Sequence, residues 1–223
     1  MKAPRLAIIS ALVPVFILTL ARAQDLKMDF QKMKERIESS NSLHIKMTID
    51  IFSDSDRSDL LLSYAAEVKR LDDEFISILN DHEMIFNRNY SLVIDHKSRT
   101  ISISKRIKTE AETIKTGQLA QLDTLLSSYM TAGELLSDVN GEKHYRFTQQ
   151  RMQIRQTDVY MTADGLFRAI EYTYTNGQVA RITFNVFEVP ASLSADDFSE
   201  KKFLNTINES FTTTPSYRKY VIL

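Results

Sequence analysis

The chain has 223 residues, a formal charge of −1 and no cysteine. The lack of cysteine excludes a disulfide scaffold, zinc–thiolate sites, a cysteine nucleophile and a lipid anchor attached through cysteine. Basic and acidic residues are nearly balanced, 28 against 29, so the sequence does not provide the basic surface that nucleic acid requires. We therefore expect no nucleic-acid partner.

The first 23 residues have the pattern of a cleavable secretory signal peptide. Basic residues precede an apolar stretch over Leu6–Leu20, and Ala21-Arg22-Ala23 matches a small-residue cleavage site. About 15 apolar residues in a helix cover roughly 22 Å, less than the roughly 30 Å of a hydrocarbon core. We predict cleavage after Ala23 and a periplasmic or secreted mature chain, residues 24–223, with a charge near −4. The alternative is an uncleaved anchor, which the cleavage site disfavours.

Two amphipathic patterns open the mature chain. In residues 25–39, apolar side chains recur at helical spacing, at Leu26, Phe30, Met33 and Ile37, and predict a helix. In residues 43–51 (LHIKMTIDI) apolar and polar residues alternate strictly, which predicts a strand with one buried and one wet face.

Shorter apolar runs separated by turn-forming residues continue to the end of the chain. They predict strands near 62–70, 74–80, 82–88, 90–95, 99–105, 134–139, 143–153, 156–162, 166–175 and 178–188. Asn140-Gly141 and Asn176-Gly177 are two-residue hairpin signals, since both positions of a type I′ turn need a positive φ. A second helix is predicted over 108–130, a short helix over 195–204 and a closing strand over 217–223.

These elements predict one α+β domain with no linker or internal repeat. Its centre is a single antiparallel sheet of about ten or eleven strands. A sheet of that length curls, and the helices would cover its concave face. No stretch after the leader is long and apolar enough to span a bilayer.

No catalytic, cofactor or metal motif is present. Four histidines, at 44, 82, 96 and 144, lack metal-ligand spacing, and His44 is expected on a wet strand face. Asp54, Asp56 and Asp59 lack the glycine and glutamate of a calcium loop and are interpreted as a solvated loop. We predict no catalytic, cofactor-binding or metal residues, and the ligand-binding residues stay unknown.

The chain contains twelve phenylalanines, nine tyrosines and eight methionines, so its apolar residues are rich in aromatic rings and in flexible methionine side chains. This composition fits ordinary core packing, and it also fits a hydrophobic cavity between the sheet and the helices. Both interpretations remain open.

Several runs in the second half resemble the periplasmic lipoprotein-carrier (LolA-like) superfamily. They are DGLFRAIEY at 164–172, RITFNV at 181–186, Val189-Pro190 and the later Phe198. The runs at 83–86, 91–96 and 100–104 are similar to uncharacterised carrier-like proteins of the Bacteroidetes type. The resemblance implies an unclosed β-half-barrel with a helical lid over an apolar cavity.

The resemblance implies a non-enzymatic periplasmic binder or carrier of a hydrophobic ligand, such as a lipid acyl chain or a lipoprotein, with transient contacts to membrane proteins. The alternative is an envelope interaction or stress-sensor module with the same fold. A hydrolase built from carboxylates or a Ser–His pair is a third hypothesis.

Overall fold

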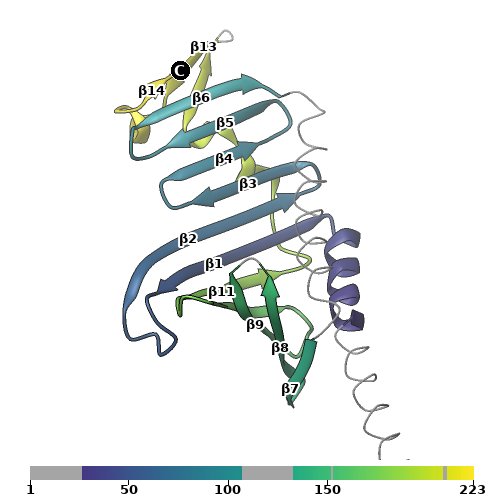
Figure 1. Ribbon diagram of the computed structural model, residues 1–223. Helices are drawn as coiled ribbons and strands as arrows, with labels where there is room; N and C mark the ends of the chain where they lie inside the picture. The colour runs from purple at the N-terminus through teal and green to yellow at the C-terminus, as the bar shows by residue number, and fades with distance from the viewer. Residues whose placement is uncertain (1–26, 107–132, 152, 208–209) are drawn as a thin grey trace, which may run out of the picture.

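The computed structural model describes residues 27–106, 133–151, 153–207 and 210–223 (Figure 1). The leader and the helix predicted over 108–130 lie outside the described residues. Among the described residues, no helix has the length and the apolar character needed to cross a membrane.

The first described element is the N-terminal helix, residues 27–39, as the sequence predicts. Its apolar stripe is buried: Phe30 and Met33 are 2% exposed and Ile37 is 5% exposed. Arg70 ties the end of the helix to the sheet, because its Nη2 donates to the carbonyl oxygens of Ile37 (2.7 Å) and Ser40 (2.9 Å).

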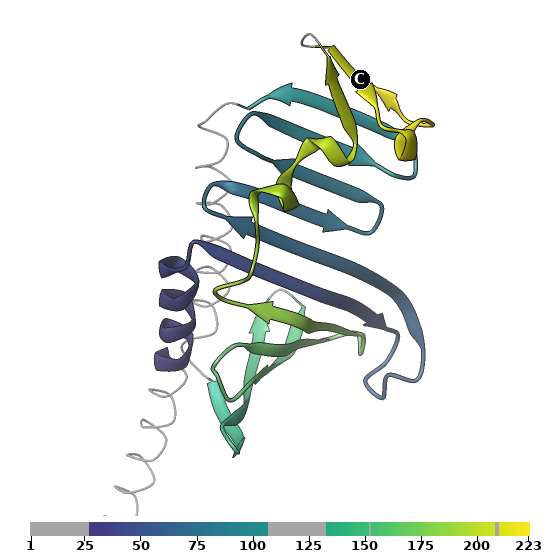
Figure 2. The same cartoon turned by 180° about the vertical axis from the view of Figure 1, so that it is seen from behind.

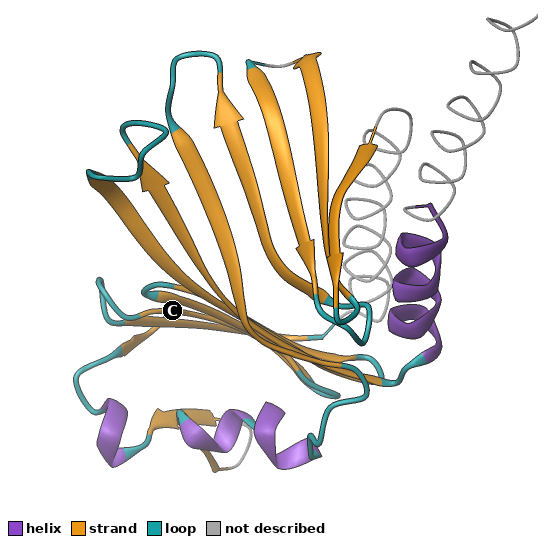
Figure 3. Cartoon of the chain, turned by 90° about the horizontal axis from the view of Figure 1, so that it is seen from below, coloured by secondary structure: helices purple, strands orange, loops and turns teal. Residues whose placement is uncertain are grey.

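Twelve of the described strands form one sheet, in the order β14-β6-β5-β4-β3-β2-β1-β11-β10-β9-β8-β7. Their bounds are β1 Ser42–Phe52, β2 Leu60–Leu71, β3 Glu74–Leu79, β4 His82–Phe86, β5 Tyr90–Asp95, β6 Thr100–Lys105, β7 Gly133–Val139, β8 Glu142–Arg151, β9 Ile154–Met161, β10 Phe167–Tyr174, β11 Val179–Glu188 and β14 Val221–Ile222. The sheet is open, and Figure 3 shows β7–β11 turning steeply out of the plane of β2–β6. This agrees with the predicted large, unclosed antiparallel sheet.

The hairpin turns differ in one respect from the prediction. Asn140 and Gly141 both adopt a positive φ (56° and 82°), as a type I′ turn requires. In the turn at Asn176-Gly177 only Gly177 does, with a φ of 90°. There the N–H of Gly177 donates a hydrogen bond to the carbonyl oxygen of Tyr174. The N–H of Tyr174 in turn donates to the carbonyl oxygen of Gln178. This pattern belongs to a turn that ends in a glycine bulge.

The C-terminal region also corrects the prediction. Residues 195–204 form two 3₁₀ turns, η1 Ala195–Phe198 and η2 Glu200–Lys202, in place of one helix. An unpredicted hairpin follows, with β12 Leu204–Ile207 and β13 Ser210–Thr213, then a third turn, η3 Pro215–Tyr217. The closing strand β14 pairs with β6 in parallel, because the chain returns across the sheet before reaching that edge (Figure 2).

Two cores lie on opposite faces of the sheet. On what we call the helix face, the N-terminal helix packs over β8–β11, where Phe30 contacts the rings of Tyr145 and Phe167. On the tail face, side chains from residues 193–207 and 210–222 pack over β3–β6 (Figure 2). The 3₁₀ turns therefore cover the face opposite to the N-terminal helix, so the described helical elements do not all lie on one face of the sheet.

Candidate ligand-binding surface

The alternation of β1 predicts five buried apolar side chains, and the structure buries only the first. Leu43 is 8% exposed, while the four that follow are half-buried: Ile45, Met47, Ile49 and Ile51. All of them point to the helix face. Cross-strand pairing places Ile49 between Tyr64 and Ile182, so the half-open surface spans β2, β1 and β11.

The same face becomes more open over β3–β5, where exposed apolar side chains lie among polar ones such as Ser77 and His82. Leu79, Met84 and Val93 are 48%, 37% and 44% exposed. Met84 lies directly opposite Val93, and Leu79 lies opposite Ala66 on β2. We define the apolar band as seven partly exposed apolar side chains on the helix face of β1 and β3–β5: Ile45, Met47, Ile49, Ile51, Leu79, Met84 and Val93.

The tail face of the same strands is closed by the protein's own chain. Ile85, Leu92, Ile94 and Ile101 on this face are at most 1% exposed. They pack against Phe198 and Phe203, both fully buried, and Leu204, which is 1% exposed. A one-sided antiparallel sheet normally turns its polar side to water, whereas here the outward side carries the apolar band.

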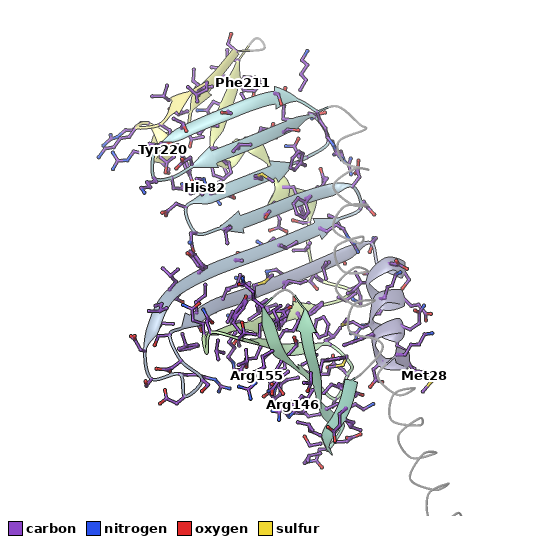
Figure 4. All side chains as sticks on the ribbon, in the orientation of Figure 1. Met28, His82, Arg146, Arg155, Phe211 and Tyr220 are labelled. Atoms are coloured by element: carbon purple, nitrogen blue, oxygen red, sulfur yellow. The ribbon has the colours of Figure 1, made fainter. Side chains whose placement is uncertain are left out.

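The four histidines are not brought together; each faces a different carboxylate. The pairs are His44–Glu67 (2.8 Å), His82–Asp95 (3.9 Å), His96–Glu83 (3.4 Å) and His144–Asp158 (2.7 Å). Figure 4 shows how far apart these places are, with His82 on the β3–β6 half and Arg146, a partner of Asp158, on the β7–β11 half. His44 lies on the polar side of β1 as expected, but its side chain is only 15% exposed because Glu67 and Glu188 flank it.

Asp158 is the most enclosed of these carboxylates, with a side chain 3% exposed. Burial alone would raise the pKa of Asp158, but hydrogen bonds from Gln156, His144 and Arg146 outweigh burial and hold that pKa below its ordinary value. Burial opposes ionisation of Glu67 in the same way, and His44, Lys69 and Lys46 nevertheless lower its pKa. Paired, ionised carboxylates of this kind stabilise the fold and are poor general bases.

The acidic loop between β1 and β2 forms no cation site. Asp54 and Asp56 accept hydrogen bonds from the backbone N–H of Ser58, which folds the loop on itself. Arg57 reaches out of the loop and donates to Glu171 Oε1 at 2.6 Å. Across the part of the chain that the structure describes, no group of three or more histidine or acidic side chains is placed to hold a metal ion.

A hollow of about 250 Å³ lies on the tail face, where β3, β2, β1 and β11 meet. Ala65 and Ile78 form part of its apolar lining, and Lys46, Thr48, Asn80 and Asn185 are among its polar residues. It is not the cavity expected between the sheet and the mid-chain helix, since that helix lies outside the described residues.

Sequence reasoning did not identify the apolar band beyond β1. The usable signal is in β3 and β4, where Phe75-Ile76 and Met84-Ile85 place apolar residues at consecutive positions. Consecutive residues of a strand point to opposite faces, so such pairs indicate a strand that is apolar on both sides. The sequence analysis predicted these strands but did not predict that both of their faces carry apolar side chains.

The chain matches no protein-family model and no curated protein sequence. Solved structures do match. The lipoprotein LppX of Mycobacterium tuberculosis is 13% identical, covers 77% of this chain and 99% of its own, and has a TM-score of 0.39. A LolA superfamily protein of Nitrosomonas europaea is 9% identical, with coverages of 80% and 98% and a TM-score of 0.29. An uncharacterised conserved protein of Thermus thermophilus is 11% identical, with coverages of 75% and 91% and a TM-score of 0.41.

The name of the Nitrosomonas europaea protein is that of the superfamily that the sequence resembles. Because these three TM-scores reach only 0.41, we infer function from the geometry of this chain.

Proposed function

We propose that this protein is a non-enzymatic binder or carrier of a hydrophobic ligand, such as a lipid acyl chain, and that the ligand lies on the apolar band. The proposal includes export: cleavage after Ala23 would release residues 24–223 as one domain in the periplasm or outside the cell. A helical cover over the band, which the sequence resemblance implies, belongs to the same proposal.

One observation carries the proposal: over β3–β6 the C-terminal segment closes the tail face, while apolar side chains on the helix face of β1 and β3–β5 stay partly exposed. Leu79, Met84 and Val93 are each more than one-third exposed, and the half-buried side chains of β1 continue the surface. Covering apolar surface contributes about 25 cal/mol per Å², before the cost of association. An extended acyl chain can cover several of these side chains at once, so it fits a surface that is long and apolar.

The test is binding of a fluorescent long-chain fatty acid to purified, delipidated protein. We expect the wild type to bind it and Met84→Lys to bind about tenfold more weakly, because a charge at this position opposes burial of roughly 1.5 kcal/mol of apolar contact. The matched control is Ile207→Lys on β12, also exposed (62%) but outside the band, which should bind like the wild type.

Native mass spectrometry of protein purified from its own host would identify the cargo. We expect a mass increment that organic extraction removes. Repeated recovery of ligand-free protein, together with no uptake of the fluorescent fatty acid, would contradict the proposal.

A further inference from the structure

The start of β2 extends past its neighbour and leaves a free strand edge. The last residue of β3, Leu79, pairs with Ala66, so residues 60–65 have no strand beside them on that side within the described chain. Figure 1 shows the lower end of β2 continuing beyond β3. This overhang begins with three exposed leucines, Leu60, Leu61 and Leu62, at 52%, 46% and 48%.

Asn80 marks where the free edge begins. Its backbone N–H donates to the carbonyl of Ala65 at 3.0 Å, and its side-chain Oδ1 accepts from the N–H of Ala65 at 3.1 Å. Both backbone groups of Ala65 therefore point toward the β3 side. Because alternate residues of an antiparallel strand point their backbone groups to the same side, those of Ser63 face the open edge.

From this geometry we infer that the β2 overhang is a docking site for an extended, apolar segment of a partner protein, which pairs with it as an added strand. An exposed apolar strand with an unpaired edge is a template for such pairing. The overhang lies beyond the end of β3, and the inference does not depend on the hydrophobic ligand.

The negative charge of the loop before the overhang indicates which charge the partner segment carries. The preceding loop contains Asp54, Asp56 and Asp59. Its one basic residue, Arg57, forms an ion pair with Glu171 on β10. The acidic side chains thus have no basic partner within the loop that could neutralise them. An incoming strand with lysine or arginine at the end nearest this loop is favoured over one with acidic residues.

The hollow on the tail face offers a place for one side chain of the added strand. Ala65 and Asn80 line the hollow, and the same two residues mark the inner end of the free edge. A strand that pairs with residues 60–64 would end next to Asn80 and bring a side chain on the tail face beside Ala65. A hollow of about 250 Å³ has room for a valine or leucine side chain.

The probe for the test is a fluorescent peptide of alternating valine and threonine that ends in two lysines, with a matched peptide that ends in two glutamates. We expect the lysine peptide to bind the full-length mature protein more tightly. In Ser63→Pro the outward N–H is lost and the backbone pairing with β1 is kept, although the side-chain hydrogen bond to Asp50 (2.6 Å) is also lost. Peptide binding should weaken about tenfold. In Leu62→Ser binding should also weaken, whereas Val139→Ser, at an exposed position on β7, should leave it unchanged.

Circular dichroism and urea denaturation verify that each variant is folded. If Ser63→Pro does not fold, Leu62→Ser with its Val139→Ser control decides the question. Equal binding of the lysine peptide by wild type, Ser63→Pro and Leu62→Ser would overturn the inference. A wild-type dimer in light scattering that Ser63→Pro converts to a monomer would also overturn it, in favour of a second copy of the chain.

Discussion

Leu92 and Val93 are adjacent in β5, yet Leu92 is fully buried and Val93 is 44% exposed. Successive residues of a strand point to opposite faces, so this pair compares the two faces at one place. Leu92 packs under the C-terminal segment with Ile85 and Phe203, whereas Val93 lies in the apolar band beside Met84. At β4 and β5 the chain thus closes the tail face and leaves apolar side chains exposed on the helix face.

The first prediction compares these two neighbours. Leu92→Ala should lower the free energy of unfolding by about 2–5 kcal/mol, because it leaves a cavity in a closed core. Val93→Ala removes exposed methyl groups and should cost less than about 1 kcal/mol. Urea denaturation followed by circular dichroism measures both values. Similar losses for the two variants would show that, at β5, the helix face is as tightly packed as the tail face.

The second prediction concerns the C-terminal segment as part of the core. Phe203 is fully buried and packs edge-on against Tyr217 with ring centroids 4.8 Å apart. Phe203→Ala should therefore destabilise the protein by about 3–5 kcal/mol. Ile207→Ala, on the same segment but 62% exposed, is the control and should change stability by less than about 0.5 kcal/mol.

Hydrogen exchange shows where the second prediction acts. In Phe203→Ala, protection should fall in β3–β6, which the segment covers, before it falls in β8–β10. Loss of protection in β8–β10 alone would contradict the described packing.

Local patterns were sufficient to predict the strands of the sheet but not the C-terminal segment. The alternation in 43–51 and the turn residues between short apolar runs placed β1 through β11 at nearly their observed bounds. The hairpin of β12 and β13 carries no alternating pattern: in LNTI and SFTT only one residue in the pair, Leu204, is buried. Its position depends on contacts with distant strands, which short-range periodicity does not encode.

The candidate surface was only partly predictable for the same reason. The apolar side of β1 could be identified from its sequence, but its incomplete burial depends on how far other elements extend over it. The tail face is closed by Phe198 and Phe203, more than 90 positions after the strand residue Leu92 that they help to bury. A pattern within one strand does not show which of its two faces a distant segment will cover.

The third prediction tests two glycines with positive φ. A Cβ at Gly141 would lie 3.1 Å from the Cβ of Ala163, whereas a Cβ at Gly177 would have nothing within 4 Å. Gly177→Ala should cost about 1 kcal/mol for the unfavourable backbone conformation alone. Gly141→Ala should cost more, about 2 kcal/mol, because the turn or Ala163 must also shift. Thermal unfolding compares the two, and an equal cost would mean that the contact with Ala163 relaxes freely.

The fourth prediction uses the carboxylate of Asp158, which accepts hydrogen bonds from His144 at 2.7 Å and Arg146 at 2.9 Å. Asp158→Asn should lower the free energy of unfolding at pH 7 by about 2–3 kcal/mol, because charge-assisted hydrogen bonds and a buried pair are lost. The pKa of Asp158 in the folded protein lies below the 3.8 of an ordinary aspartate. Its ionised form therefore stabilises the fold above pH 3.8, and this stabilisation is lost as the pH falls through the folded-state pKa.

Denaturation of wild type and Asp158→Asn between pH 3 and 8 measures this effect. We expect a constant difference from about pH 5 upward and a difference that shrinks below about pH 4. Asp138→Asn is the control, because Asp138 lies exposed on β7, and its effect should stay within about 0.5 kcal/mol at every pH. If the Asp158→Asn difference instead grew as the pH fell, the folded-state pKa of Asp158 would be raised, and the hydrogen bonds from His144, Arg146 and Gln156 would not outweigh its burial.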